Sequence, residues 1–317
     1  MVSASPPLAL APPDSTDRWR WLRALLILPL PLWLMMRSRR QGVISPLLDQ
    51  LDPRIVDLLA TIATGVLCHV LVNRLRTRHV PWPAAILMVV APMMAAQFTA
   101  PATRWDLSAV ISLALIVVAL GGYLRFVTDA QTLGGFIAGI TLALAAVCDL
   151  ATLGYMAGFA AAVPFVAGPW AREVSATTAI LAVLAYPSIA VYLGWLYIQW
   201  RFGDVVALDT TAPAAAAFDL ARGALTAVEA AGHAPLYLAA GIAIARSRPA
   251  TMPAYLMPML VVALLSAGGV EDSPLVVNFF YTAVAVTAIQ TRLDRRRWLL
   301  LTAVAMLQAG LALIWPP

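Results

Sequence analysis

The sequence predicts an all-α, polytopic integral membrane protein, a bundle of about eleven transmembrane helices. Three observations support this fold class. Hydrophobic residues make up 62% of the chain and charged residues only 12%. The mean hydropathy is +0.84. Apolar runs close to the length that crosses a bilayer recur along the whole chain. A water-soluble domain cannot bury so much apolar surface, so the composition argues against a soluble enzyme and against a nucleic-acid-binding module.

The N-terminal part of the chain divides into a tail, a first span and a polar loop. Residues 1–17 are rich in Pro, Ala and Ser, so we expect a disordered cytoplasmic tail there, and residues 18–317 are expected to form one transmembrane domain. The first span is predicted at Trp19–Met36. After the loop, Asp52 followed by Pro53 is typical of a helix N-cap with proline in the first turn, which predicts the start of the second span.

Nine further spans follow from the lengths of the apolar runs. They are predicted at 82–98, 106–123, 131–148, 150–167, 177–199, 232–245, 252–268, 274–291 and 298–315. The run at 232–245 is the shortest of them, since its fourteen residues fall short of the roughly twenty that cross a bilayer.

The stretch Gln131–Gly168 is the most informative helical pair in the chain. Two apolar runs flank a single acidic residue, Asp149, and each run carries glycines at i and i+4. These are Gly135 and Gly139 in the first run and Gly154 and Gly158 in the second. In lipid, small residues let helix backbones approach closely, so we expect two antiparallel neighbours with these glycines at helix contacts. A carboxylate is costly in hydrocarbon, which places Asp149 at a membrane surface.

Arginine placement predicts the orientation. All 21 basic residues are arginine. With the N-terminus inside, fourteen arginines fall on the cytoplasmic side and seven on the outer side. The outer seven are Arg37, Arg39, Arg40, Arg54, Arg104, Arg201 and Arg222. We therefore expect a multi-pass protein of the prokaryotic inner membrane, with a cytoplasmic N-terminus.

The longest excursion between spans, Arg201–Gly232, contains an alanine-rich segment that is predicted to form a helix at about 213–231. Its apolar face would consist of Phe218, Ala221, Leu225 and Val228. Three charges, on Asp219, Arg222 and Glu229, argue against a spanning role. An amphipathic helix on the outer membrane surface is the expected arrangement.

The first outer loop holds the leading candidates for chemistry. Asp49 and Asp52 are candidate catalytic bases, and four arginines are candidate ligands for a lipid phosphate, because guanidinium groups bind phosphate in a bidentate fork. The arginines are Arg37, Arg39, Arg40 and Arg54. The alternative is that Asp52 only caps the second span and that the arginines contact ordinary lipid headgroups. Asp49 has no evident capping role.

Asp149 is the third candidate base, with helix capping at its turn as the alternative. A metal site is not predicted, because the three histidines fall at different levels of the membrane. They are His69, His79 and His233.

The region from Pro83 to Gly168 resembles the membrane core of the GT-C glycosyltransferases, the multispanning enzymes that use polyprenyl-phosphate sugars. The likeness lies in AAILMVVAPMMAAQFTAPATRWDLSAVISLALIVVAL, a YLRF turn, and GGFIAGITLALAAVCDLATLGYMAGF. The later segment YIQWRFGD is similar to an aromatic-Gly-Asp segment of some members.

The resemblance implies sugar transfer from a polyprenyl-phosphate donor at the outer face. A carboxylate of the first outer loop, Asp49 or Asp52, would deprotonate the acceptor hydroxyl. A non-catalytic subunit that packs against other membrane subunits is the alternative function. A transporter is disfavoured, because the sequence shows neither a broken-helix pair nor an internal repeat.

Overall fold

The computed structural model describes residues 51–99, 107–149, 152–166, 174–202, 218–247, 249–269, 274–289 and 292–315. Within these ranges the chain forms eleven α-helices, one short 3₁₀ helix and no strand, so the all-α class is confirmed. They are α4 (Pro53–Arg76), α5 (Trp82–Thr99), α6 (Leu107–Asp129), α7 (Thr132–Cys148), α8 (Thr152–Val166), α9 (Val174–Phe202), α10 (Leu220–Gly232), α11 (Pro235–Ser247), η2 (Pro249–Thr251), α12 (Met252–Ala267), α13 (Pro274–Ala288) and α14 (Arg295–Ile314). The predicted first span lies outside the described residues.

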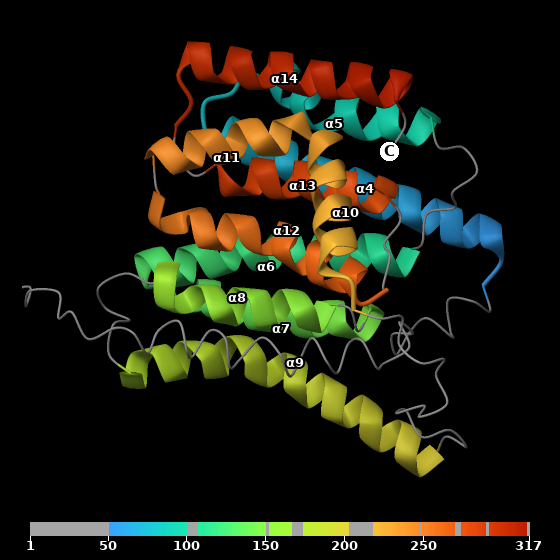
Figure 1. The fold of residues 1–317 in the computed structure, drawn as a ribbon, viewed down its shortest axis with the longest axis vertical. Coiled ribbons are helices and arrows are strands. Elements are labelled where there is room, and N and C mark those ends of the chain that lie inside the picture. The colour runs from blue at the N-terminus through green and yellow to red at the C-terminus, as the bar shows by residue number, and fades with distance from the viewer. Residues whose placement is uncertain are drawn as a thin grey trace, which may run out of the picture.

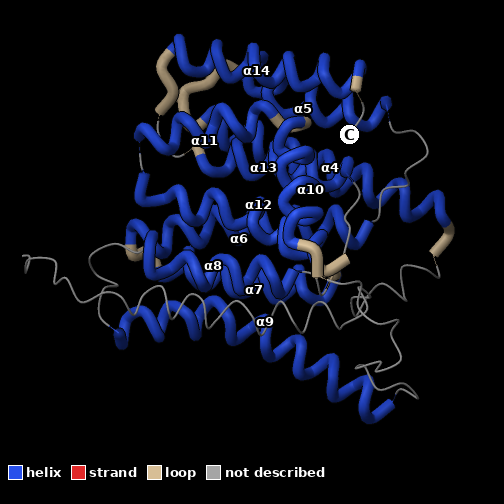
Figure 2. The backbone as a smooth tube through the Cα atoms, viewed as in Figure 1, coloured by secondary structure: helices blue, strands red, loops and turns tan. Residues whose placement is uncertain are grey.

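The helices run side by side and reverse direction from one to the next, with α10 as the exception (Figure 1). The bundle therefore has two ends. The arginine end is where α4, α6 and α11 finish and α5 and α14 begin. The opposite end is where α4 begins and α7 finishes. Figure 2 shows the connections at both ends as short loops wherever they are described.

Four of the described helical segments are long and apolar enough to cross a membrane. They are Arg54–Arg76, Val110–Asp129, Thr177–Ile198 and Arg295–Ile314. A bent pair, α10 with α11, would make a fifth if it is one span. Shorter apolar helices fill the rest of the bundle, so the protein has the character of a helical membrane protein.

Two helices form the centre of the bundle. On α13, the side chains from Val277 to Thr287 are almost all fully buried. The neighbouring α6 contacts α7, α8 and α13, and its Tyr123 ring stacks on Phe159 of α8 with centroids 5.2 Å apart. The pair α5 and α14 forms one edge of the bundle, and α9 forms the other (Figure 1).

The start of α4 confirms the predicted cap. The backbone N–H of Arg54 donates to Oδ1 of Asp52 at 2.8 Å, and Pro53 occupies the first turn. Proline is favoured there because its missing N–H would have had no partner within the helix. This part of the fold follows directly from two adjacent residues.

Gly135, Gly139 and Gly158 lie at helix contacts, but their partners differ from the expected ones. A Cβ on Gly139 of α7 would lie 2.5 Å from the Val183 carbonyl oxygen of α9. A Cβ on Gly158 of α8 would lie 3.1 Å from Cγ2 of Val261 on α12. Helix α7 packs chiefly on α6 and α9, and α8 packs chiefly on α12 and α9. The loop at Asp149 connects α7 to α8, but Gly139 of α7 and Gly158 of α8 contact other helices, α9 and α12.

Helix α10 replaces the helix expected at 213–231. It begins only at Leu220, because Asp219 is its N-cap and accepts hydrogen bonds from the N–H groups of Ala221 and Arg222, each at 3.0 Å. Residues 213–217 lie outside the described part. The helix turns by 93° relative to α11 and crosses the bundle (Figure 1).

The two faces of α10 differ in side-chain size. Gly223, Ala227 and Ala231 are buried, and a Cβ on Gly223 would clash with the Ala263 carbonyl oxygen of α12. The larger apolar residues of the predicted face are exposed, with Leu225 at 68%. A perpendicular helix with exposed apolar side chains fits a position at the membrane surface, which stays a prediction.

A buried polar network fixes the elbow between α10 and α11. The Asn278 amide of α13 donates to the His233 carbonyl at 2.9 Å, and the Leu236 N–H donates to Oε1 of Gln308 on α14 at 3.1 Å. Nε2 of Gln308 donates to Oδ1 of Asn278 at 3.1 Å and to Oγ1 of Thr282 at 2.8 Å. Side chains of α13 and α14 thus bond to backbone groups that the break at Pro235 leaves without helical partners.

The bent pair bears on the transporter alternative, which was disfavoured because no broken helix was evident in the sequence. The structure contains one such pair. In transporters of this kind, the free ends of the half-helices bind the substrate. Here the His233 carbonyl and the Leu236 N–H are already bonded to Asn278 and Gln308. The elbow is therefore part of the packing and gives a transporter no added support.

Candidate functional site

Only some of the predicted site residues fall within the described part of the chain. Asp49 and three of the four loop arginines lie outside it; those arginines are Arg37, Arg39 and Arg40. Asp52 and Arg54 are both exposed at the start of α4. One carboxylate oxygen of Asp52 accepts the capping hydrogen bond from the Arg54 N–H. Asp52 therefore has the capping role that was the alternative to catalysis.

Asp149 lies at the same end of the bundle as Asp52, because α4 begins where α7 finishes (Figure 1). It follows the last residue of α7, and its N–H donates to the Ala145 carbonyl at 2.9 Å. Its own carbonyl accepts a hydrogen bond from the Thr152 N–H at 3.1 Å, at the start of α8. Both hydrogen bonds involve the backbone of Asp149. A catalytic role for its carboxylate stays a prediction.

A concave site lies at the arginine end, between α11 and α14. It is a cavity of about 400 Å³ whose walls are mostly apolar. The lining residues are Ala239, Ile242, Ala243, Ile244, Arg246, Ser247, Thr251, Ala288, Ile289, Leu293, Arg297, Leu300 and Leu301. We call this cavity the α11–α14 cleft. Neither Asp52 nor Asp149 lines it.

Helical periodicity explains how the cleft forms. On α11, residues 239, 242, 243, 246 and 247 share one face, and on α14 residues 297, 300 and 301 share another. Ile244 and Leu301 are buried, whereas Ile242 and Leu300 are exposed on the side of the bundle. On each helix the arginine lies at the arginine end. The cleft therefore has an apolar body and a basic mouth formed by Arg246 and Arg297.

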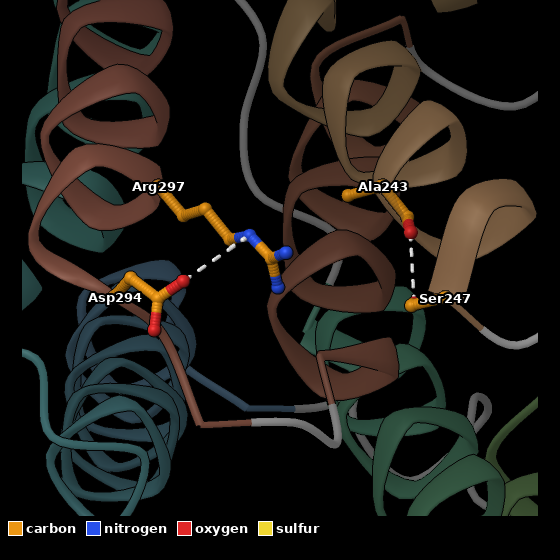
Figure 3. A network of polar contacts seen from close by, with 4 residues as sticks. All are labelled: Ala243, Ser247, Asp294 and Arg297. Atoms are coloured by element: carbon orange, nitrogen blue, oxygen red, sulfur yellow. Dashed lines mark hydrogen bonds and ion pairs between the residues drawn. The ribbon is translucent and has the colours of Figure 1, made fainter.

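Figure 3 shows the polar mouth from close by. The Arg297 guanidinium extends from α14 into the space between α14 and α11, and Ser247 lies on the opposite side. Oγ of Ser247 donates to the Ala243 carbonyl at 2.8 Å. The mouth thus combines two cations with hydroxyl groups, Thr251 being the second.

Arg297 also forms an ion pair along its own helix. Its Nε atom lies 3.7 Å from Oδ2 of Asp294, and the two side chains are 60% and 76% exposed. A pair this exposed contributes little to stability, because water screens it. It can yield readily to a stronger anion, and a phosphate can accept a bidentate contact from the guanidinium.

The chemistry of the cleft suits an amphipathic anion. Two guanidinium groups favour a phosphate, and the apolar walls favour a hydrocarbon chain. Among the described residues, no group of three or more His, Cys, Asp or Glu side chains is placed to hold a metal ion. The two guanidinium groups offer a phosphate positive charge and hydrogen-bond donors.

Sequence reasoning missed this site because it concentrated on the outer loops. In the sequence, Arg246 and Arg297 contributed only to the orientation, as two of the fourteen arginines on the expected cytoplasmic side. Their pairing depends on α11 and α14, which are separated by two other helices in the chain. The available signal was the apolar face below each arginine, at i−3 and i−4 on α11 and at i+3 and i+4 on α14.

A comparison with models of known protein families found no match. Comparisons with curated proteins and with solved structures found none either.

Proposed function

We propose that this protein is a polytopic membrane protein of about eleven spans that binds the phosphate of a lipid in the α11–α14 cleft. The observation that carries the proposal is the pair Arg246 and Arg297 at the mouth of an apolar cavity of about 400 Å³. The lipid phosphate would contact the two guanidinium groups, and the start of its chain would lie along Ile242 and Leu300.

The shape of the cleft supports a lipid over a soluble phosphate ester. Its volume falls in the range of small-molecule pockets, and its inner wall offers branched aliphatic side chains rather than hydrogen-bonding groups. The mouth lies at the end of the bundle, where the arginines begin. A phosphate at that level would sit among the headgroups, and the rest of the chain would remain in the bilayer.

The glycosyltransferase reaction is a second proposal. It rests on the GT-C resemblance, and the placement of Asp52 and Asp149 at one end of the bundle supports it (Figure 1). Asp49, Asp52 or Asp149 would act as the base at the outer face, opposite the cleft. In a lipid-linked sugar the phosphate is bonded directly to the sugar carbon that the acceptor attacks, so the donor phosphate would have to lie beside the base at the outer face. The lipid in the α11–α14 cleft would then be a different molecule from the sugar donor.

The lipid-binding proposal is tested by native mass spectrometry of the purified protein with added polyprenyl phosphate. We expect the parent to retain the lipid, and Arg246→Gln and Arg297→Gln to weaken its binding roughly tenfold or more, since each removes a charge-assisted contact. Ala243→Trp keeps both charges but fills the cleft, so it should also reduce binding. Arg222→Gln, an exposed arginine on α10 that does not line the cleft, is the charge-matched control.

Equal lipid retention by Arg246→Gln, Arg297→Gln and Arg222→Gln would refute the cleft as the phosphate site. The two proposals are separated by offering a radiolabelled polyprenyl-phosphate sugar. Transfer that is lost in Asp149→Asn or Asp52→Asn, with lipid retention unchanged, would support the glycosyltransferase. Retention without transfer in the parent would favour the non-catalytic membrane subunit.

A further inference from the structure

A second group of arginines gathers on the backbone of α6 at the arginine end. The side chain of Arg74, in the last turn of α4, lies against Gly121, where an added Cβ would come within 2.7 Å of Nη1. Nε of Arg125 donates to the Gly121 carbonyl at 3.2 Å. Two guanidinium groups from different helices therefore meet at one glycine.

Among the described residues, two further arginines lie close enough to Arg74 to act on its charge. They are Arg125 and Arg78, and both repel it. Its Nε–H is buried and has no hydrogen-bond acceptor among the described residues. A partly buried guanidinium with an unsatisfied donor and like charges beside it is unfavourable, and an anion would relieve both penalties.

The surroundings place this cluster at headgroup level. The Arg76 guanidinium lies over the Trp82 ring, 5.0 Å from its centroid, in the same turn between α4 and α5. Tryptophan and arginine are typical of membrane interfaces. The Leu293 N–H donates to the Arg78 carbonyl at 3.1 Å, which ties the turn to the segment that precedes α14.

We propose that Arg74, Arg78 and Arg125 form a phosphate-binding site on α4 and α6, separate from the α11–α14 cleft. Gly121 provides the space that brings the guanidinium of Arg74 beside that of Arg125. The ligand is a phosphate group, from an anionic lipid headgroup or from free phosphate. Neither Arg74 nor Arg125 lines the cleft, so this site can be occupied whether or not the cleft is.

The test uses the full-length protein carrying Arg246→Gln and Arg297→Gln, which silences the cleft. The melting temperature of this double variant is measured in phosphatidylcholine nanodiscs. In the first arm, phosphatidylglycerol is added to the nanodiscs. In the second arm, sodium phosphate is compared with sodium chloride of equal ionic strength. A ligand that binds only the folded state raises the melting temperature. We expect a rise in at least one arm, and the arm identifies the source of the phosphate.

Arg74→Gln should abolish that rise, with an apparent phosphate affinity roughly tenfold lower or more. It should also melt above its background in phosphatidylcholine alone, because like-charge repulsion is removed. A merely structural arginine would lower the melting temperature there. Arg292→Gln, an exposed arginine at the same end, removes the same charge and should keep the full rise.

Gly121→Ala is the second variant, in case Arg74→Gln folds poorly. The added Cβ displaces the end of the flexible Arg74 side chain and changes no charge. Alanine is the better helix former, so the variant should fold while losing the phosphate-dependent rise. The proposal is overturned if neither arm raises the melting temperature of the background, or if Arg74→Gln and Gly121→Ala both keep the rise.

Discussion

The peptide N–H of Leu236 donates a hydrogen bond to the side-chain oxygen of Gln308 across 3.1 Å, although 72 residues separate them. Gln308 is fully buried, and its amide nitrogen donates to both Asn278 and Thr282. One side chain on the last helix thereby satisfies the first turn of α11 and joins it to α13. The stability of the elbow should depend on it.

Replacing Gln308 by leucine should lower the melting temperature in detergent. The change keeps the approximate size of the side chain but leaves the Leu236 N–H and Oδ1 of Asn278 without their partner, at a cost of about 1–3 kcal/mol for each buried group that finds no other. Met306→Leu, at an exposed position of the same helix, is the control. Equal melting of the two variants would show that the elbow does not need the network.

The tyrosine stack provides a matched pair of substitutions. The Tyr237 ring lies 4.6 Å from the Tyr255 ring on one side and 4.6 Å from the Tyr281 ring on the other. The Tyr237 hydroxyl donates to the Tyr255 carbonyl at 2.7 Å, while the buried Tyr281 hydroxyl has no partner among the described residues. Tyr237→Phe should therefore destabilise by about 1 kcal/mol, and Tyr281→Phe should be neutral or stabilising. Thermal melting of both variants decides this, and the reverse order would contradict the assignment.

The packing role of the glycines is tested by leucine substitutions. Gly139→Leu should lower the melting temperature strongly, because the Val183 backbone leaves no space for a side chain. Gly158→Leu should do so to a lesser degree, since it meets the side chains of Val261 and Met257. Gly194→Leu is the control, as nothing lies within 4 Å of its Cβ position. A loss of stability in Gly194→Leu equal to that in Gly139→Leu would exclude specific packing.

Orientation is tested by labelling with a membrane-impermeant thiol reagent in a variant that lacks Cys68 and Cys148. Asp209→Cys should be modified from outside the cell, because it lies in the long loop that the arginine bias places there. Asp294→Cys, beside the mouth of the α11–α14 cleft, should be protected until the membrane is opened. The reverse pattern would place the cleft on the outer side, where the resemblance locates sugar transfer.

Much of the helical architecture could be predicted from local sequence. Apolar length located the helices, and a cap such as Asp52 with Pro53 gave the start of α4 almost to the residue. The start of α10 was misplaced, because Asp219 was assigned to the helix surface although its side chain is the N-cap. A carboxylate at a helix start and one within a helix look alike unless the following N–H groups are considered.

Contacts between helices were much harder to infer. Gly139 and Gly158 predicted close helix packing, but a small residue does not specify its partner. The partners are α9 for Gly139 and α12 for Gly158. The α11–α14 cleft has the same character. Arg246 and Arg297 line one cavity only because α11 and α14 adjoin, and Gln308 links the two helices through its hydrogen bond from the Leu236 N–H.

The lengths of the helices also determine how the protein deforms the membrane around it. Helix α11 has 13 residues, which corresponds to about 20 Å, whereas the hydrocarbon core of a bilayer is about 30 Å thick. Helix α9, on the far edge of the bundle, has 29 residues, or about 43 Å. If both helices lie in the bilayer, α11 is shorter than the hydrocarbon core and α9 is longer, so we expect the lipids beside α11 to thin and α9 to tilt. The protein should then prefer thin membranes or short acyl chains beside α11.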